Sequence, residues 1–154
     1  MKVAIGQDSH RFDDSNSDKP LILGGVVFEG EQPLLANSDG DVILHAVTRA
    51  ISGITTVDVL GPKTKEFLKN GITDSRVYLE EGLKDLEGNI SHLSISIECK
   101  RPRITPRIPE MRRSLAAMLK TDEKNIGITA TSGEELTEFG KGNGINVFAV
   151  ITVE

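Results

Sequence analysis

The spacing of apolar residues predicts several strands in this chain. Apolar and polar residues alternate over 91–99, which is typical of a half-buried strand. An almost unbroken apolar run over 145–153 indicates a more deeply buried strand. A further strand is expected at 126–130, and LILGGVVF at 21–28 predicts two short strands around a Gly-Gly turn.

Other apolar residues recur at the spacing of helices. Such spacing predicts a helix over 42–53, with Ser38 or Asp39 able to act as its N-cap. A second helix is expected over 75–86, and prolines suit the entry to a third over 109–119.

Strands and helices therefore alternate along the chain, which favours an α/β (α+β) fold with a mixed sheet covered by helices. A length of 154 residues suits one domain, 1–154, with one core. The polar stretch 13–20 indicates a surface loop. Residues 55–71, with several lysines and a glycine near each end, suggest a mobile segment with a short helix at 63–69.

Composition excludes some classes of protein. Hydrophobic residues make up 38% of the chain, and no apolar run approaches the roughly 20 residues that span a bilayer. Residues 1–6 lack a secretory signal pattern, so a cytoplasmic protein without membrane partners is expected. The single cysteine, Cys99, excludes an internal disulfide and a cysteine-rich zinc site, and is typical of a small buried side chain.

The net charge of −5 argues against a general nucleic-acid-binding protein. Basic residues are nevertheless concentrated in 100–113, KRPRITPRIPEMRR, which contains six of them and one acid. This segment suits a local site for an anionic ligand, and it suits a solvated approach to a helix equally well.

The chain contains three histidines, and two of them can form a metal site. Asp8 and His10 lie two residues apart at the end of an expected strand, so their side chains leave the same face. His45 lies in the helix that follows SDGD. Two imidazoles and a carboxylate, with a fourth position open, describe a catalytic zinc site. Asp-x-His is also a common turn, and a lone His45 is also compatible with an ordinary core position.

Two segments can bind phosphate. At the SDGD stretch, backbone N–H groups and the Ser38 hydroxyl can hold a phosphate, although Asp39 and Asp41 would repel it and at least one of them suits helix capping better.

In the segment 130–144, Thr131, Ser132 and the Gly133 amide can surround phosphate oxygens, Glu134 can hold Mg²⁺, and Lys141 can reach the same phosphates. A capping box at Thr131 or Ser132 explains the same residues. No P-loop sequence is present.

Taken in order, five segments resemble the 2-C-methyl-D-erythritol 2,4-cyclodiphosphate synthase family. They cover nearly the whole chain apart from about 55–71, and the most specific is ANSDGDVILHAV. The segments are IGQDSHRF at 5–12, LILGGV at 21–26, ANSDGDVILHAV at 36–47, RPRITPRIPEMR at 101–112 and ATSGEELTEFGKGNGI at 130–145.

This resemblance implies a homotrimer around a central channel, with each active site between neighbouring subunits. It implies Zn²⁺ held by Asp8, His10 and His45, and a second ion, Mg²⁺ or Mn²⁺, near Glu134. The implied substrate is 4-diphosphocytidyl-2-C-methyl-D-erythritol 2-phosphate. Its 2-phosphate attacks the β-phosphorus, which closes a cyclic diphosphate and expels CMP.

The expected site residues follow from the matched segments. Asn37 and Ser132 are expected to stabilise the transition state as hydrogen-bond donors. Cytidine is expected at 99–105, and the diphosphate beside Thr131 and Ser132. The substrate-binding set is Asp8, Ser9, His10, Asn37, Ser38, Gly61, Cys99, Lys100, Arg101, Pro102, Arg103, Ile104, Thr105, Thr131, Ser132, Gly133, Glu134 and Lys141.

Three positions depart from the family pattern. Asn37 stands where the family usually has His, and Arg49 where it usually has Asp. The sequence VDVLGPKTKEF at 57–67 replaces the loop that normally contacts the methylerythritol group. The unusual 55–71 segment leaves a second hypothesis, a non-catalytic metal-dependent nucleotide-binding or regulatory homologue. Turnover to CMP distinguishes the two.

Overall fold

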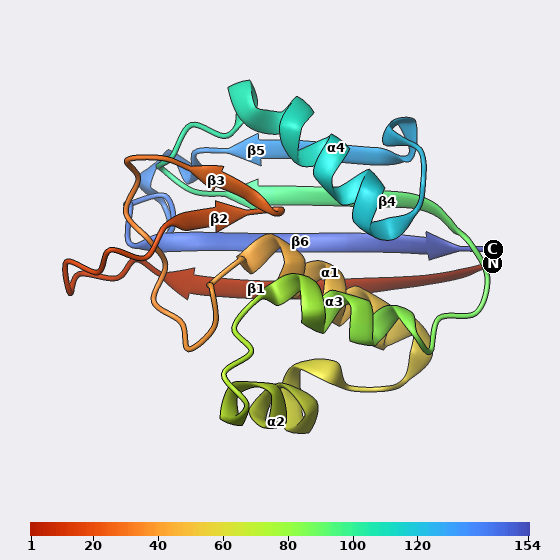
Figure 1. The fold of residues 1–154 in the computed structure, drawn as a ribbon. Helices are drawn as coiled ribbons and strands as arrows, with labels where there is room; N and C mark the ends of the chain where they lie inside the picture. Colours follow the sequence, from red (N-terminus) through yellow and green to blue (C-terminus); the bar gives the residue numbers. More distant parts are fainter.

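A computed structural model describes all of residues 1–154 and has a four-stranded sheet at its centre (Figure 1). The strand order is β1 (Lys2–Arg11), β6 (Gly144–Val153), β4 (Ile90–Glu98) and β5 (Ile126–Thr131). β4 and β5 run parallel, whereas β6 is antiparallel to both of its neighbours. The prediction of a mixed sheet is confirmed, and so are its four strands.

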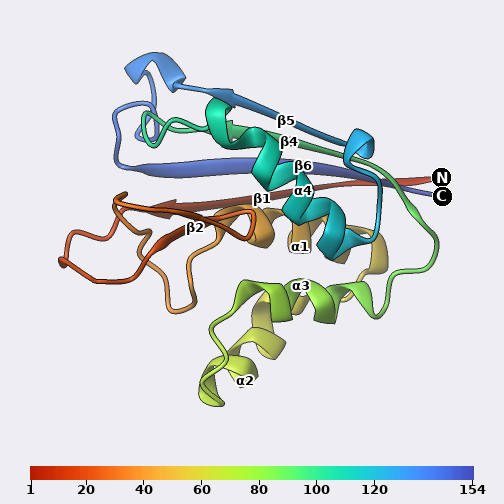
Figure 2. The ribbon, with the colours of Figure 1, turned by 45° about the horizontal axis from the view of Figure 1, so that its top comes forward.

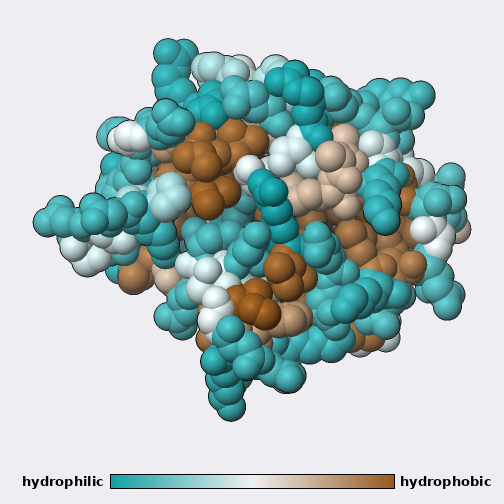
Figure 3. Space-filling view, in the orientation of Figure 1, coloured by the Kyte–Doolittle hydropathy of each residue, from teal (hydrophilic) through white to brown (hydrophobic).

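Helices gather on one face of this sheet (Figure 2). They are α1 (Val42–Thr55), α3 (Ser75–Leu83) and α4 (Ile108–Leu119), and the hairpin β2 (Leu21–Leu23) and β3 (Val26–Phe28) packs with them. One cluster of 31 buried apolar residues joins the sheet, the hairpin and the helices. On the helix side, apolar patches are broken up by hydrophilic side chains (Figure 3).

The opposite face of the sheet remains uncovered. Val3 and Ile5 of β1 are 59% and 62% exposed, and Phe148 and Val150 of β6 are also exposed. Ile5 pairs with Val150 across the two strands, so these side chains form one apolar strip. An uncovered apolar strip of this kind is typical of a surface that another chain covers.

A glycine sets the distance between α1 and β1. A Cβ atom on Gly6 would lie 2.1 Å from the carbonyl oxygen of Ala46 and 2.4 Å from the nitrogen of Ala50. Any larger residue at position 6 would therefore push the helix away from the strand. Because Asp8 follows Gly6 on the same face and His45 precedes Ala46, this close contact brings Asp8 and His45 together.

The N-cap of α1 is Asp41. The first candidates, Ser38 and Asp39, do not cap it, whereas the expectation that Asp39 or Asp41 acts as a cap is confirmed. The Asp41 carboxylate accepts hydrogen bonds from the backbone N–H groups of Leu44 at 3.0 Å, Gly24 at 2.9 Å and Gly25 at 2.7 Å. One buried side chain thus caps the helix and also anchors the β2–β3 turn. The sequence could not distinguish the three candidates, because the choice depends on where the hairpin lies.

The 55–71 segment does contain the expected short helix. A π-helical turn, Val59–Lys63, leads into α2 (Thr64–Lys69). Among the other predicted helices, the one expected over 75–86 ends earlier, at Leu83. No helix has the length and apolar character needed to cross a bilayer.

Candidate metal centre and active-site cleft

Asp8, His10 and His45 meet in a small triangle on the helix-covered face of β1. Oδ2 of Asp8 lies 3.0 Å from Nε2 of His10 and 3.1 Å from Nδ1 of His45. The two imidazole nitrogens are 3.3 Å apart. This is the only group of three or more histidine, cysteine, aspartate or glutamate side chains in the chain that is arranged to hold a metal ion.

The hydrogen bonds behind the triangle orient both imidazoles. Nδ1 of His10 lies 3.1 Å from the carbonyl oxygen of Leu35, which can only accept, so Nδ1 carries the proton and Nε2 is free for a metal. Nε2 of His45 lies 2.8 Å from the Ser75 hydroxyl, and that hydroxyl in turn donates to Asp39. His45 therefore donates through Nε2 and presents Nδ1 to the triangle.

The charges of the triangle suit a cation. Burial favours the neutral acid, but hydrogen bonds and charge from His10 and His45 hold the pKa of Asp8 well below its usual range. Burial lowers the pKa of His10, but its hydrogen bond and ion pair with Asp8 outweigh this and raise it above the ordinary value. Asp8 is therefore an ionised ligand at neutral pH, and a metal ion competes with a proton for His10.

The geometry fits zinc. In a tetrahedral site with ligand bonds of about 2.0–2.1 Å, neighbouring ligand atoms lie about 3.3 Å apart. The three distances in the triangle, 3.0, 3.1 and 3.3 Å, are close to that value. Two nitrogens and one oxygen are common zinc donors, and three protein ligands leave the fourth position for a water or a substrate oxygen.

The triangle forms one end of a cleft of about 430 Å³. Asn37 and Ser38 line the cleft beside the triangle, as expected of substrate-binding residues. The other wall is apolar and consists of Leu60, Leu68 and Tyr78, two of them from the unusual 55–71 segment. Gly61 does not line the cleft; it lies beside the carboxylate of Asp58.

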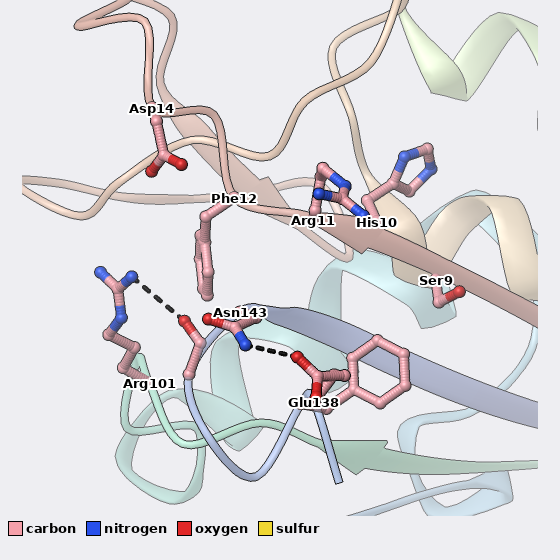
Figure 4. Close-up of a pocket in the computed structure, with 10 residues that line it drawn as sticks. Ser9, His10, Arg11, Phe12, Asp14, Arg101, Glu138 and Asn143 are labelled. Carbon is pink, nitrogen blue, oxygen red and sulfur yellow. Dashed lines mark hydrogen bonds between the residues drawn. The ribbon is translucent and has the colours of Figure 1, made fainter.

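A second cavity of about 540 Å³ also reaches His10 (Figure 4). The predicted site residues Ser9 and Arg101 line it. The Arg101 guanidinium lies 4.3 Å from the centre of the Phe12 ring and donates to the carbonyl oxygen of Gly142 at 3.3 Å. These two contacts hold the exposed Arg101 side chain beside Phe12, just beyond the end of β1.

The residues expected to bind phosphate lie outside both cavities, although Glu138, Gly142 and Asn143 of the same segment line the second cavity with His10. Thr131, Ser132, Gly133, Glu134 and Lys141 line neither cavity. Thr131 ends β5 and Ser132–Glu134 follow it, whereas β1 lies at the opposite edge of the sheet. With about 4.8 Å between strands, three spacings separate the two edges by roughly 14 Å. One chain therefore does not bring Asn37 and Ser132 together.

Local structure at this loop agrees with the capping interpretation. The Ser132 hydroxyl accepts from the backbone N–H of Glu134 at 3.4 Å, at the start of a short 3₁₀ turn. Upstream, in the expected cytidine segment, Pro102 and Ile104 are buried while Arg101, Arg103 and Thr105 are exposed. Cys99 is buried, and this burial raises the pKa of its thiol to about 12, so it is no nucleophile at neutral pH.

Sequence reasoning missed the residues that orient His45. Ser75 lies 30 positions away along the chain, at the start of α3, and Asp39 was treated only as a cap or a phosphate neighbour. No periodicity marks such a partner, because the contact depends on how α3 packs on α1. The apolar wall made by Leu60, Leu68 and Tyr78 was missed for the same reason.

Comparison with known proteins identifies the family. The model of the YgbB family matches residues 1–154. The chain belongs to the YgbB family. Among curated relatives, the 2-C-methyl-D-erythritol 2,4-cyclodiphosphate synthase of Chlamydia caviae is 50% identical over 155 residues, covering 99% of this chain and 88% of that protein. The synthase of Chlamydia trachomatis serovar L2b is 48% identical over 155 residues, with 99% of this chain and 87% of that protein covered.

Solved structures agree with this family assignment. A 2C-methyl-D-erythritol-2,4-cyclodiphosphate synthase in its CDP-bound form aligns with a TM-score of 0.85 and 25% identity, covering 99% of this chain and all of that one (100%). The bifunctional IspDF of Campylobacter jejuni aligns at 0.84 with 29% identity, covering 97% of this chain and 41% of that one. The family resemblance inferred from the ordered motifs is confirmed.

Proposed function

We propose that this YgbB-family chain converts 4-diphosphocytidyl-2-C-methyl-D-erythritol 2-phosphate to 2-C-methyl-D-erythritol 2,4-cyclodiphosphate and CMP at the Asp8–His10–His45 triangle. This is the phosphorus–oxygen lyase reaction of the non-mevalonate isoprenoid pathway, for which its relatives are named. The observation that carries the proposal is a formed zinc-ligand triangle in a chain about half identical to those synthases.

The reaction needs no side-chain base. An anionic oxygen of the 2-phosphate forms a bond to the β-phosphorus, the bond from that phosphorus to the bridging oxygen breaks, and CMP leaves with the electron pair. The difficulty lies in bringing anions together and in the charge of the transition state. Zinc held by Asp8, His10 and His45 would supply positive charge against phosphate oxygens when bound.

The other residues position and stabilise the reacting groups. Asn37 and Ser38 line the cleft beside the triangle, where an amide and a hydroxyl can donate to the substrate. Thr131 and Ser132 are assigned to the diphosphate. Glu134 is assigned to a second ion, Mg²⁺ or Mn²⁺, and Lys141 to the phosphates that this ion contacts. Cytidine is assigned to residues 99–105.

A homotrimer around a central channel completes the proposal. Two features support it. One is the uncovered apolar strip on β1 and β6. The other is the roughly 14 Å between β1, which carries Asp8 and His10, and β5, which leads into the nucleotide loop, Thr131–Glu134. In a cyclic assembly, the β5 edge of one subunit can face the triangle of the next. Light scattering should give three times the chain mass; a monomer at working concentration contradicts this part.

Turnover tests the function directly. Zinc-loaded protein incubated with the diphosphocytidyl substrate and Mg²⁺ should release one CMP for each cyclodiphosphate formed, as followed by ³¹P NMR. Protein that binds CDP and zinc but releases no CMP would instead be the regulatory homologue considered from the sequence. An equal measurement without Mg²⁺ shows whether the second ion is required.

A further inference from the structure

We propose that Arg49 binds the attacking 2-phosphate and positions it beside the metal triangle, as a substrate-binding residue specific to this chain. The inference rests on the proposed function and adds a residue to it. Arg49 lies on α1 four residues after His45, so the two side chains leave the same face of the helix one turn apart.

Arg49 reaches the triangle through Asp8. Its Nε lies 3.9 Å from Oδ1 of Asp8, whereas the other oxygen, Oδ2, lies against the two imidazoles. One oxygen of Asp8 thus faces the triangle and the other faces the guanidinium. No hydrogen bond within the chain involves the Arg49 side chain, and 45% of that side chain is exposed, so its N–H donors are available to a ligand.

Arg49 is the only lysine or arginine among the residues that line the cleft. One other cation is fixed beside the cleft but does not line it: the Lys19 ammonium donates to the carbonyl oxygens of Ala36 at 3.1 Å and Ser38 at 3.2 Å. Three basic residues near the nucleotide loop are already engaged: Lys100 pairs with Glu135 at 2.9 Å, Lys141 with Glu138 at 3.5 Å, and Arg101 stacks on Phe12. A guanidinium without a close partner beside a metal site is well suited to bind two oxygens of one phosphate.

The position of Arg49 selects which phosphate it binds. The cleft contains none of the residues assigned to cytidine and to the diphosphate, 99–105 and Thr131–Ser132. We assign to the cleft the end of the substrate remote from cytidine, which carries the methylerythritol group and its 2-phosphate. The apolar wall of Leu60 and Leu68 faces the carbon skeleton, and Arg49 faces the phosphate.

Binding measurements separate this role from a structural one. In Arg49→Met, the affinity for 2-C-methyl-D-erythritol 2,4-cyclodiphosphate, which retains the 2-phosphate, should fall about 10- to 100-fold by calorimetry, as expected for loss of a charged hydrogen bond. Affinity for CDP and zinc content by atomic absorption should stay within about twofold of the parent protein. Arg49→Lys should recover part of the affinity, because it keeps the charge and loses the planar fork.

The control is Lys63→Met, which removes a positive charge from the neighbouring segment, where Lys63 pairs with Glu81 at 3.2 Å outside the cleft. It should leave both affinities unchanged. An unchanged cyclodiphosphate affinity in Arg49→Met overturns the proposal. So does a parallel loss of zinc and CDP, because Arg49 would then act only by holding Asp8. A parent protein that binds both ligands but forms no CMP refutes the proposed function instead.

Discussion

The metal triangle and the nucleotide loop differ in how completely one chain forms them. At the triangle, both imidazoles are held by the hydrogen bonds that they donate to the Leu35 carbonyl and the Ser75 hydroxyl, and the close contact of α1 with β1 sets their distance to Asp8. At the nucleotide loop, Thr131, Ser132 and Glu134 are exposed and line neither cavity of the same chain.

This difference has a physical cause. The triangle lies on the face that α1 covers, so the packing that stabilises the core also positions the ligands. The loop after β5 lies at the far edge of the sheet, where the same core exerts no such constraint. We therefore expect substitutions at the triangle to act within one subunit, and substitutions at the loop to act across the proposed subunit interface.

The largest effect is expected from removing a ligand at the triangle. In His45→Ala the zinc content should fall below a tenth of the parent value, and kcat/KM should fall about 1,000-fold, as expected when several kcal/mol of metal stabilisation are lost. Circular dichroism should show the fold retained. His92→Ala, which alters an exposed histidine outside the triangle, is the control. Full zinc content in His45→Ala would exclude the site.

The next largest effect should come from the two proposed donors, one in each region. Asn37→Ala and Ser132→Ala should each lower kcat about 30- to 1,000-fold, because a positioned donor contributes about 2–4 kcal/mol in the transition state. CDP affinity should change far less than kcat. Ser114→Ala on α4 serves as the hydroxyl control. If both variants keep near-normal kcat, neither residue is catalytic.

A smaller effect, on stability and geometry together, is expected at Gly6. In Gly6→Ala the new Cβ collides with the α1 backbone, so the free energy of unfolding should fall by about 1–3 kcal/mol and zinc affinity should fall with it. Gly127→Ala is the matched control, because a Cβ atom added there would lie 3.9 Å from its nearest neighbour, Nε2 of His92. Urea denaturation measures the unfolding free energy of both variants. Equal values for Gly6→Ala and Gly127→Ala would show that α1 can shift without a loss of stability.

A further effect on stability, of similar size, concerns pH and the Asp41 cap. Burial raises the pKa of Asp41 to about 6, against the hydrogen bonds from Leu44, Gly25 and Gly24 that lower it. The folded state therefore holds a proton between about pH 4 and 6 that the unfolded state has lost, so this group's stabilisation is full below pH 4 and disappears as the pH rises through 6.

Compared with Asp41→Asn, the parent protein should thus lose up to about 3 kcal/mol of unfolding free energy as the pH rises from 4 to 7. Urea titrations at a series of pH values measure this difference. Asp122→Asn, which alters an exposed aspartate, should show no such difference. Parallel stability curves for the parent protein and Asp41→Asn would contradict the raised pKa.

Local patterns predicted the elements well and their partners poorly. Alternation over 91–99 and the apolar run over 145–153 correspond to β4 and β6, because burial against helices imposes those periods. The cap at Asp41 and the contact from Ser75 to His45 join residues from different elements. Neither leaves a periodic trace, so neither could be found from spacing.

The amino-acid sequence alone determined the family, the mixed sheet and the zinc-ligand candidates, because ordered motifs and apolar periods are local properties of the chain. Tertiary structure alone decided that Asp8, His10 and His45 converge, that Leu60 and Leu68 wall the cleft, and that Ser132 lies elsewhere. These outcomes depend on how closely α1 approaches β1 and on which edge of the sheet each strand occupies. Both are set by packing between segments that are distant in the sequence.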